Sequence, residues 1–291
     1  MARVSLDQAR AIFGNAPPPK RVIERQFDGF DSELFALSQT PQDRVTPAEL
    51  WYYLHDLAYV DLQPELFDYL FPVCLSFWYS SLMSNHDCAQ GDAEFHYALA
   101  HGGILEKMVT PAQRERILVF FHDGFLDRLD IERGFATTSV QPPAYSWMWR
   151  FNSLGIVAPI IERVWTSWWS LESPGQAVSA LMYASGLMYR RGENPIFPAS
   201  PYGYPPLWEN DSYIFDSGWL PENLEFLWGV LSTDYLRQKV AEASRRLTTE
   251  PESAMASRLE QDFERCAETV EKRIEMLLQL LVAPPPCTVD W

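Results

Sequence analysis

The chain has 291 residues, of which 47% are hydrophobic and 14% aromatic, and this supply of apolar side chains excludes intrinsic disorder over most of its length. Its 39 acidic groups outnumber its 23 basic groups and give a formal net charge of -16. Such a charge repels nucleic-acid phosphates and the anionic inner face of a membrane, so neither is an expected partner. A basic protein is the expected partner class, because an acidic field speeds its association.

Helix start signals and apolar periodicity predict an all-α, multi-helix array. Three starts combine a hydroxyl at the N-cap, proline at the first helical position and Glu or Gln at the third, namely Thr46–Glu49, Thr110–Gln113 and Ser173–Gln176. Pro72 should kink or divide its helix near Phe71, because proline removes a backbone donor. We expect helices near residues 3–13, 47–59, 64–84, 92–100, 111–130, 146–170, 174–190, 221–247 and 252–282.

The last of these helices has the strongest apolar stripe, and its length would let it brace two halves of the protein. The residues along one face of it step by three or four, namely Met255, Leu259, Phe263, Cys266, Val270, Ile274, Leu277 and Leu281. The prolines at Gln141–Pro143 interrupt the helical pattern, which indicates an N-terminal half over 1–140 and a tryptophan-rich half over 141–291. A single continuous domain is the alternative.

Neither a membrane span nor a secretory signal is expected. The uncharged runs 69–85 and 173–189 fall short of the roughly 20 apolar residues that a span requires. The first 13 residues carry Arg3, Asp7 and Arg10 and contain no apolar core. Together with four widely spaced cysteines, which are expected to stay reduced, these features predict a cytoplasmic protein.

A long loop from Gly192 to Gly218 mixes aromatic and acidic side chains. Rings supply anchors and carboxylates supply charge at many protein interfaces, so this loop is the candidate binding site for a basic partner. The competing interpretation is that the loop folds back over the core and buries its rings. The candidate partner-binding residues are Tyr202, Tyr204, Trp208, Glu209, Asp211, Tyr213 and Asp216.

Tryptophans gather in the second half, and two interpretations of them remain open. They can pack the core, or they can line a pocket for an aromatic or cationic ligand. We expect some of the rings to be partly exposed, because Trp165, Trp168 and Trp169 point in more than one direction around a helix.

All histidines lie in the first half, near acidic residues, and they support the alternative of a metal-dependent hydrolase or oxygenase. The doublets His55-Asp56 and His122-Asp123 resemble those of the metal-binding phosphohydrolases that are named after such a pair. No H-E-x-x-H, Walker or G-x-S-x-G motif accompanies them, so no catalytic residue and no cofactor is predicted. The ligands under this alternative are His55, His86, His96 and His122.

The leading hypothesis is a non-catalytic acidic protein that binds, and by binding neutralises, a basic protein. At the level of class, an acidic helical cytoplasmic chain without catalytic motifs looks like the bacterial immunity proteins that neutralise a cognate toxin. That likeness implies a toxin as the partner and an inhibited enzyme as the outcome.

Overall fold

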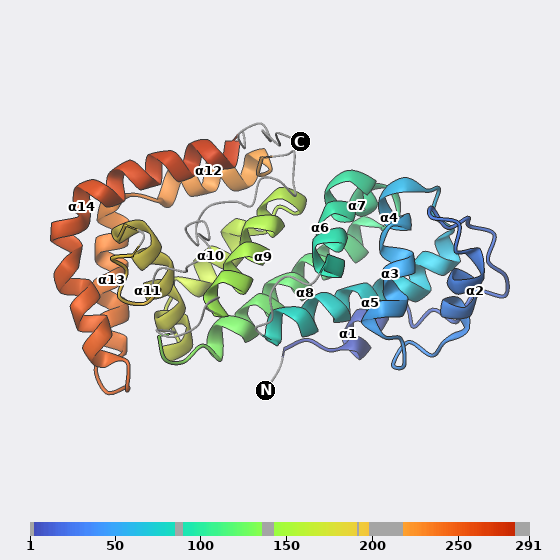
Figure 1. Cartoon of the computed structure of the whole chain (residues 1–291), viewed down its shortest axis with the longest axis horizontal. Helices are drawn as coiled ribbons and strands as arrows, with labels where there is room; N and C mark the ends of the chain where they lie inside the picture. Colours follow the sequence, from blue (N-terminus) through green and yellow to red (C-terminus); the bar gives the residue numbers. More distant parts are fainter. Residues whose placement is uncertain (1–2, 85–89, 136–142, 191, 198–217, 283–291) are drawn as a thin grey trace. The chain divides into compact units, whose positions relative to one another are not determined.

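The computed structural model describes residues 3–84, 90–135, 143–190, 192–197 and 218–282. Within these residues all regular secondary structure is α-helical, which confirms the predicted fold class (Figure 1). The chain divides into two compact units, Met1–Gly124 and Phe125–Trp291. This division falls inside α8 (Pro111–Asp130), and most of the predicted boundary at Gln141–Pro143 lies outside the described residues.

Unit 1 is built around α5, which packs against α1, α2, α3 and α6. Phe67 and Phe71 of α5 each meet the ring of Phe13 edge-on at 5.8 Å between centroids. The helix runs unbroken through Pro72, so the predicted division near Phe71 is wrong. Every residue from Tyr69 to Leu75 is buried, and this packing outweighs the roughly 3 kcal/mol that an interior proline costs. The helices of unit 1 are α1 (Leu6–Ile12), α2 (Asp31–Gln39), α3 (Pro47–Leu54), α4 (Asp56–Tyr59), α5 (Pro64–Met83), α6 (Gln90–Gly102) and α7 (Ile104–Lys107), followed by the start of α8.

In unit 2 the helix α11 (Pro174–Met188) is the centre of the core, because every residue from Gly175 to Met188 is buried. It packs against α9 (Pro143–Val157), α13 (Thr233–Arg246) and α14 (Ser253–Val282). The remaining elements of the unit are α10 (Ile161–Trp168) and α12 (Pro221–Val230). Among the described residues, no helix combines the length and apolar character needed to cross a membrane.

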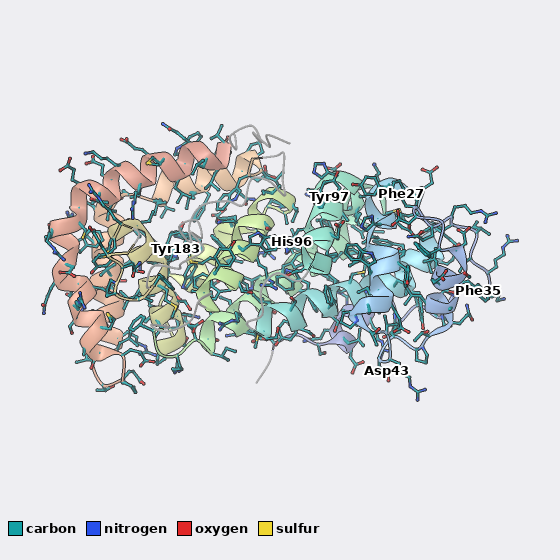
Figure 2. All side chains as sticks on the ribbon, in the orientation of Figure 1. Phe27, Phe35, Asp43, His96, Tyr97 and Tyr183 are labelled. Atoms are coloured by element: carbon teal, nitrogen blue, oxygen red, sulfur yellow. The ribbon has the colours of Figure 1, made fainter. Side chains whose placement is uncertain are left out.

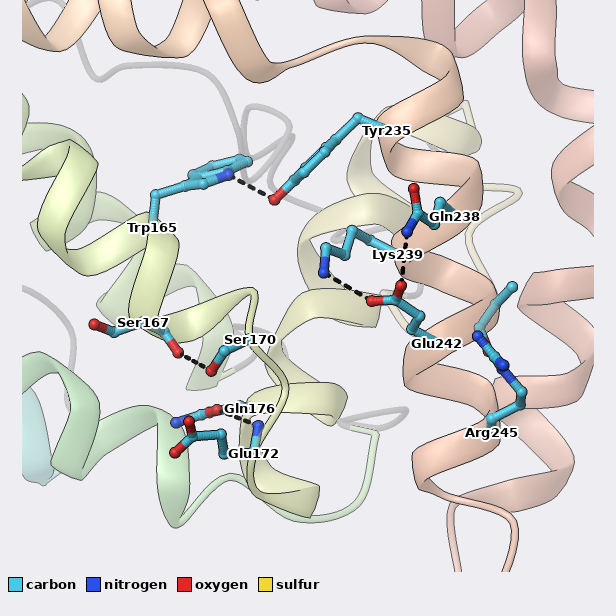
Figure 3. Close-up of polar contacts among 11 residues, drawn as sticks. Trp165, Ser167, Ser170, Glu172, Gln176, Tyr235, Gln238, Lys239, Glu242 and Arg245 are labelled. Atoms are coloured by element: carbon cyan, nitrogen blue, oxygen red, sulfur yellow. Dashed lines mark hydrogen bonds and ion pairs between the residues drawn. The ribbon is translucent and has the colours of Figure 1, made fainter.

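The three predicted helix starts are confirmed in atomic detail. Thr46 and Glu49 form a reciprocal capping box, and Thr110 and Gln113 bond in the same way. At α11 only half of the pattern is present, since Ser173 Oγ accepts from Gln176 N at 3.2 Å while the Gln176 side chain turns to the amide of Glu172 (Figure 3).

Two long predicted helices are in fact pairs of helices. The segment predicted over 146–170 separates into α9 and α10 at Pro159, which lacks an N–H and disfavours helix in the residue before it. The segment predicted over 221–247 separates into α12 and α13, because Ser232 has extended backbone and caps α13 by accepting from Tyr235 N at 3.2 Å. Helix α2 is absent from the prediction.

The tryptophans of unit 2 form a buried aromatic cluster, so the expectation that some of these rings are exposed is wrong. Trp147, Trp165, Trp168 and Trp169 are each no more than 2% exposed. Because α10 ends at Trp168, the tryptophans are not spread around a long helix. The Tyr183 ring of α11 packs against Trp165, Trp168 and Trp169. Trp165 Nε1 donates to the Tyr235 hydroxyl at 2.9 Å, as Figure 3 shows, and Figure 2 places Tyr183 within the unit.

Candidate functional site

The residues that the sequence predicts for partner binding lie outside the described residues, as does His86. Their role stays a prediction. The candidate site that the structure does describe lies in unit 1, and of its residues the sequence predicts a role only for His55, as a metal ligand under the alternative hypothesis.

A row of aromatic rings lies where the loop before α2, the α3–α4 junction and α6 come together. Phe27 stacks on Tyr59 with 4.7 Å between ring centroids, Tyr59 stacks on Tyr97 at 5.9 Å, and Tyr97 meets His101 at 4.2 Å. The ring centroids of Trp51 and His55 are 4.8 Å apart, and these two rings continue the row. Phe27 and Tyr97 are labelled in Figure 2. We call the following six residues the ring surface: Phe27, Trp51, His55, Tyr59, Tyr97 and His101.

The ring surface is open to solvent. Phe27 is 52% exposed and Tyr59 46%, and two further large apolar side chains of the same loop, Ile23 and Phe30, are 64% and 45% exposed. Soluble proteins seldom gather exposed apolar side chains unless they contact a partner. A hydrogen bond with Tyr97 raises the pKa of Tyr59 to about 12, so the Tyr59 hydroxyl stays protonated and the ring stays uncharged at neutral pH.

Carboxylates flank the rings. His55 Nε2 lies 3.3 Å from Glu94 Oε2, and His55 Nδ1 lies 3.8 Å from Asp28 Oδ2. Seven acidic side chains and two basic ones lie between residues 23 and 59. Aromatic faces and carboxylates both attract cations, so this surface is chemically suited to Lys and Arg side chains.

The described histidines are not arranged as a shared metal site. The two carboxylates beside His55 face opposite nitrogens of its ring, so one ion could not contact both carboxylates and the imidazole. His96 is buried in α6 with Asp92 3.7 Å away, and His122 bonds its neighbour Asp123 at 2.8 Å. Within the described part of the chain, no three His, Cys, Asp or Glu side chains form a group that could hold a metal ion.

The loop that carries Phe27 has no regular secondary structure, yet side chains hold its backbone at many points. Phe27 N donates to Asp56 Oδ1 at 2.8 Å, and Gly29 closes the turn with a φ of 82°, which side-chain-bearing residues rarely adopt. The other amides held by side-chain oxygens are Ile23 and Glu24, by Gln63; Gln26, by Asp31; and Phe30, by Gln26.

Two buried carboxyl groups lie beneath this loop. Glu24 Oε2 accepts from Gln63 N and Asp56 Oδ1 accepts from Phe27 N, whereas the second oxygen of each carboxyl group, Glu24 Oε1 and Asp56 Oδ2, is buried with no hydrogen-bond donor among the described residues. Two carboxyl groups can hydrogen-bond to each other only when they share a proton, and such a proton would satisfy both of these oxygens. Burial is the main cause that raises the pKa of Glu24 from 4.5 to about 8 and the pKa of Asp56 from 3.8 to about 7.

We expect unit 1 to become less stable as the pH rises from about 4 to about 8. Both pKa values are raised on folding, so the folded chain binds more protons than the unfolded chain in this window and loses this stabilisation above it. Each pH unit over which one extra proton is held lowers the free energy of unfolding by about 1.4 kcal/mol. Urea titrations at a series of pH values, with wild type compared with Glu24→Gln, measure the effect.

In that comparison, Glu24→Gln should flatten the pH dependence, because an amide donates to Asp56 at every pH. Glu33→Gln removes a partly exposed charge on α2, outside the buried pair, and should keep the wild-type slope. Equal slopes for wild type and Glu24→Gln would contradict the shared proton.

The sequence contains a local signal for the ring surface, although the predicted partner-binding residues do not include it. Phe27 and Phe30 lie next to Asp28 and Asp31, which is the same mixture of rings and acids that marks the Gly192–Gly218 loop. The approach of Tyr59 and Tyr97 has no local signal, because 38 positions separate them and only the packing of α4 against α6 brings them together.

Comparisons with known proteins leave the site to be interpreted from its own geometry. No family model matches the chain, and neither the curated proteins nor the solved structures include a match.

Proposed function

We propose that this chain is a non-catalytic binding protein that engages a basic protein through the ring surface. The observation that carries the proposal is the exposed stack of Phe27 on Tyr59 with Asp28 and Glu94 beside it. A partner that covers these rings removes apolar area from water, and its Lys or Arg side chains can lie over ring faces beside carboxylates. The net charge of -16 speeds the encounter with such a partner.

The finer form of the proposal is that binding neutralises the partner, as an immunity protein does to a toxin in the bacterial cytoplasm. Its support is the acidic, helical composition and the ring surface, which is suited to covering a basic active site. The segment from Tyr202 to Asp216 belongs to the proposal as a second contact region with the same mixture of rings and acids.

The test uses a peptide array whose members range from acidic to basic, probed at physiological ionic strength. We expect saturable binding to basic members only. Phe27→Ala should weaken it by about tenfold, since a buried aromatic anchor typically contributes more than about 1 kcal/mol. Phe35→Ala is the matched control, because Phe35 is also 52% exposed but lies on α2, away from the ring surface (Figure 2). It should change binding by less than about twofold.

Charge removal gives an independent readout. Asp28→Asn combined with Glu94→Gln should slow association and flatten its salt dependence, because both carboxylates flank the rings. Neutralising Glu209, Asp211 and Asp216 together tests the second region in the same way. Binding that is equally strong for wild type, Phe27→Ala and the charge variants would refute the ring surface as the interface.

A further inference from the structure

Hydrogen bonds link the buried carboxyl pair of Glu24 and Asp56 to the loop that displays Phe27. Asp56 holds the amide of Phe27 through Oδ1, while its Oδ2 and Glu24 Oε1 are both buried with no hydrogen-bond donor among the described residues, so one proton shared between the two groups would satisfy both oxygens. Glu24 in turn accepts from Gln63 N, while the side chain of Gln63 accepts from the amides of Ile23 and Glu24. A connected network of hydrogen bonds therefore runs from the carboxyl pair to the backbone of the loop that carries Phe27.

The surroundings of the pair offer little to offset a second negative charge. Glu24 is 6% exposed and Asp56 fully buried. Without the shared proton, two carboxylates would face each other out of contact with water, which is strongly unfavourable. The other groups whose charges act on Glu24, Asp56 or the adjacent buried Tyr53 are acids, namely Asp28 on the loop, Asp31 on α2 and Asp68 and Cys74 on α5. The nearby basic groups face other acids. Arg25 pairs with Asp31 on the exposed side, and His55 faces Asp28 and Glu94.

The least disruptive way to relieve this repulsion is for the loop to move. Loop residues lie outside any helix, so separating Glu24 from Asp56 breaks side-chain contacts and leaves the helices of unit 1 in place. The same movement withdraws the acceptor from Phe27 N and displaces the Phe27 ring from Tyr59. An apolar anchor that is no longer held in one position binds more weakly.

We propose that the proton shared by Glu24 and Asp56 is a latch that holds the ring surface in its binding conformation, so that the chain binds its partner at neutral and mildly acidic pH and releases it at alkaline pH. This inference rests on the proposed function of the ring surface as an interface. The proton leaves to solvent water when the latch opens, and no other reactant is needed.

The latch itself can be tested without any partner, using trypsin as the probe of the loop. Lys20, Arg21 and Arg25 are cleavage sites within or beside the loop. We expect cleavage there to increase from about pH 7 to about pH 9 in the wild type, around the pKa of the pair. Glu24→Gln and Asp56→Asn should both suppress the increase, because either amide donates a hydrogen bond in place of the shared proton. Dividing the cleavage rate of each variant by that of the wild type at the same pH removes the pH dependence of trypsin itself.

The functional consequence is measured on the basic peptides of the array. Wild-type affinity should fall at least about tenfold between about pH 7 and about pH 9, whereas Glu24→Gln should retain it; the fall corresponds to about 1.4 kcal/mol. Glu33→Gln, the same change on a partly exposed residue outside the buried pair, should follow the wild type. Both Glu24→Gln and Asp56→Asn are measured, so that the test stands even if one of the two variants fails to fold.

The outcomes separate the two proposals. Cleavage and affinity that change equally with pH in wild type, Glu24→Gln and Asp56→Asn would refute the latch. If cleavage responds as expected but Phe27→Ala binds basic peptides as well as the wild type, the proposed function fails and the latch controls the loop alone.

Discussion

Replacing Trp168 with alanine is expected to lower the unfolding free energy of unit 2 by about 4 kcal/mol, which is typical of a large buried ring replaced by a methyl group. The Trp168 side chain is fully buried, and its ring lies 5.3 Å from the rings of both Trp147 and Trp169. Its Nε1 donates to Gln176 O at 3.1 Å, so the variant also loses this buried hydrogen bond. Urea denaturation followed by tryptophan fluorescence measures the change.

The control for this variant is Trp228→Ala, since Trp228 is the same residue type but is 53% exposed on α12. It should cost less than about 0.5 kcal/mol. Similar losses for the two variants would contradict the placement of Trp168 at the centre of the aromatic cluster.

Glu132→Ala should be comparably damaging, with a loss of about 3–5 kcal/mol, because it leaves the charge of Arg128 buried without its carboxylate. Arg128 Nη2 lies 2.7 Å from Glu132 Oε2, and both side chains are almost completely buried. Burial raises the pKa of Glu132 and lowers the pKa of Arg128, and each partner partly offsets the shift of the other. The guanidinium of Arg150, which also lowers the pKa of Arg128, adds to the repulsion that remains.

Two further variants decide whether this loss reflects an unpaired buried charge. Arg128→Met combined with Glu132→Leu removes both charges and should lose much less stability than Glu132→Ala alone. Glu268→Ala breaks an exposed pair with Lys272 on α14 and should leave the free energy of unfolding nearly unchanged in the same urea titration. A double variant less stable than Glu132→Ala would show that packing dominates, not charge.

Features whose chemistry lies within one turn of helix could be predicted from the sequence. The N-cap hydroxyls of Thr46, Thr110 and Ser173 fixed three helix starts, because the groups that satisfy one another are at most three residues apart. The stripe from Leu259 to Leu281 predicted the buried face of α14 for a similar reason, since one regular period extends over the whole helix.

Features that depend on distant packing could not be predicted in this way. Pro72 lies inside a continuous helix because its neighbours are buried, and the tryptophans of α10 are covered by α11 and α13, which follow later in the chain. The ring surface forms where three segments meet, and the pairing of Glu24 with Asp56 joins a loop to a helix start 32 positions away.

The complete burial of α11 has a consequence for how the protein folds during its synthesis. The helices that cover α11 include α13 and α14, which leave the ribosome after it. Until they emerge, an apolar helix with no charged residue between Pro174 and Met188 is exposed to solvent and to other nascent chains. We therefore expect chaperones to contact α11 in the interval after it emerges and before α13 and α14 do.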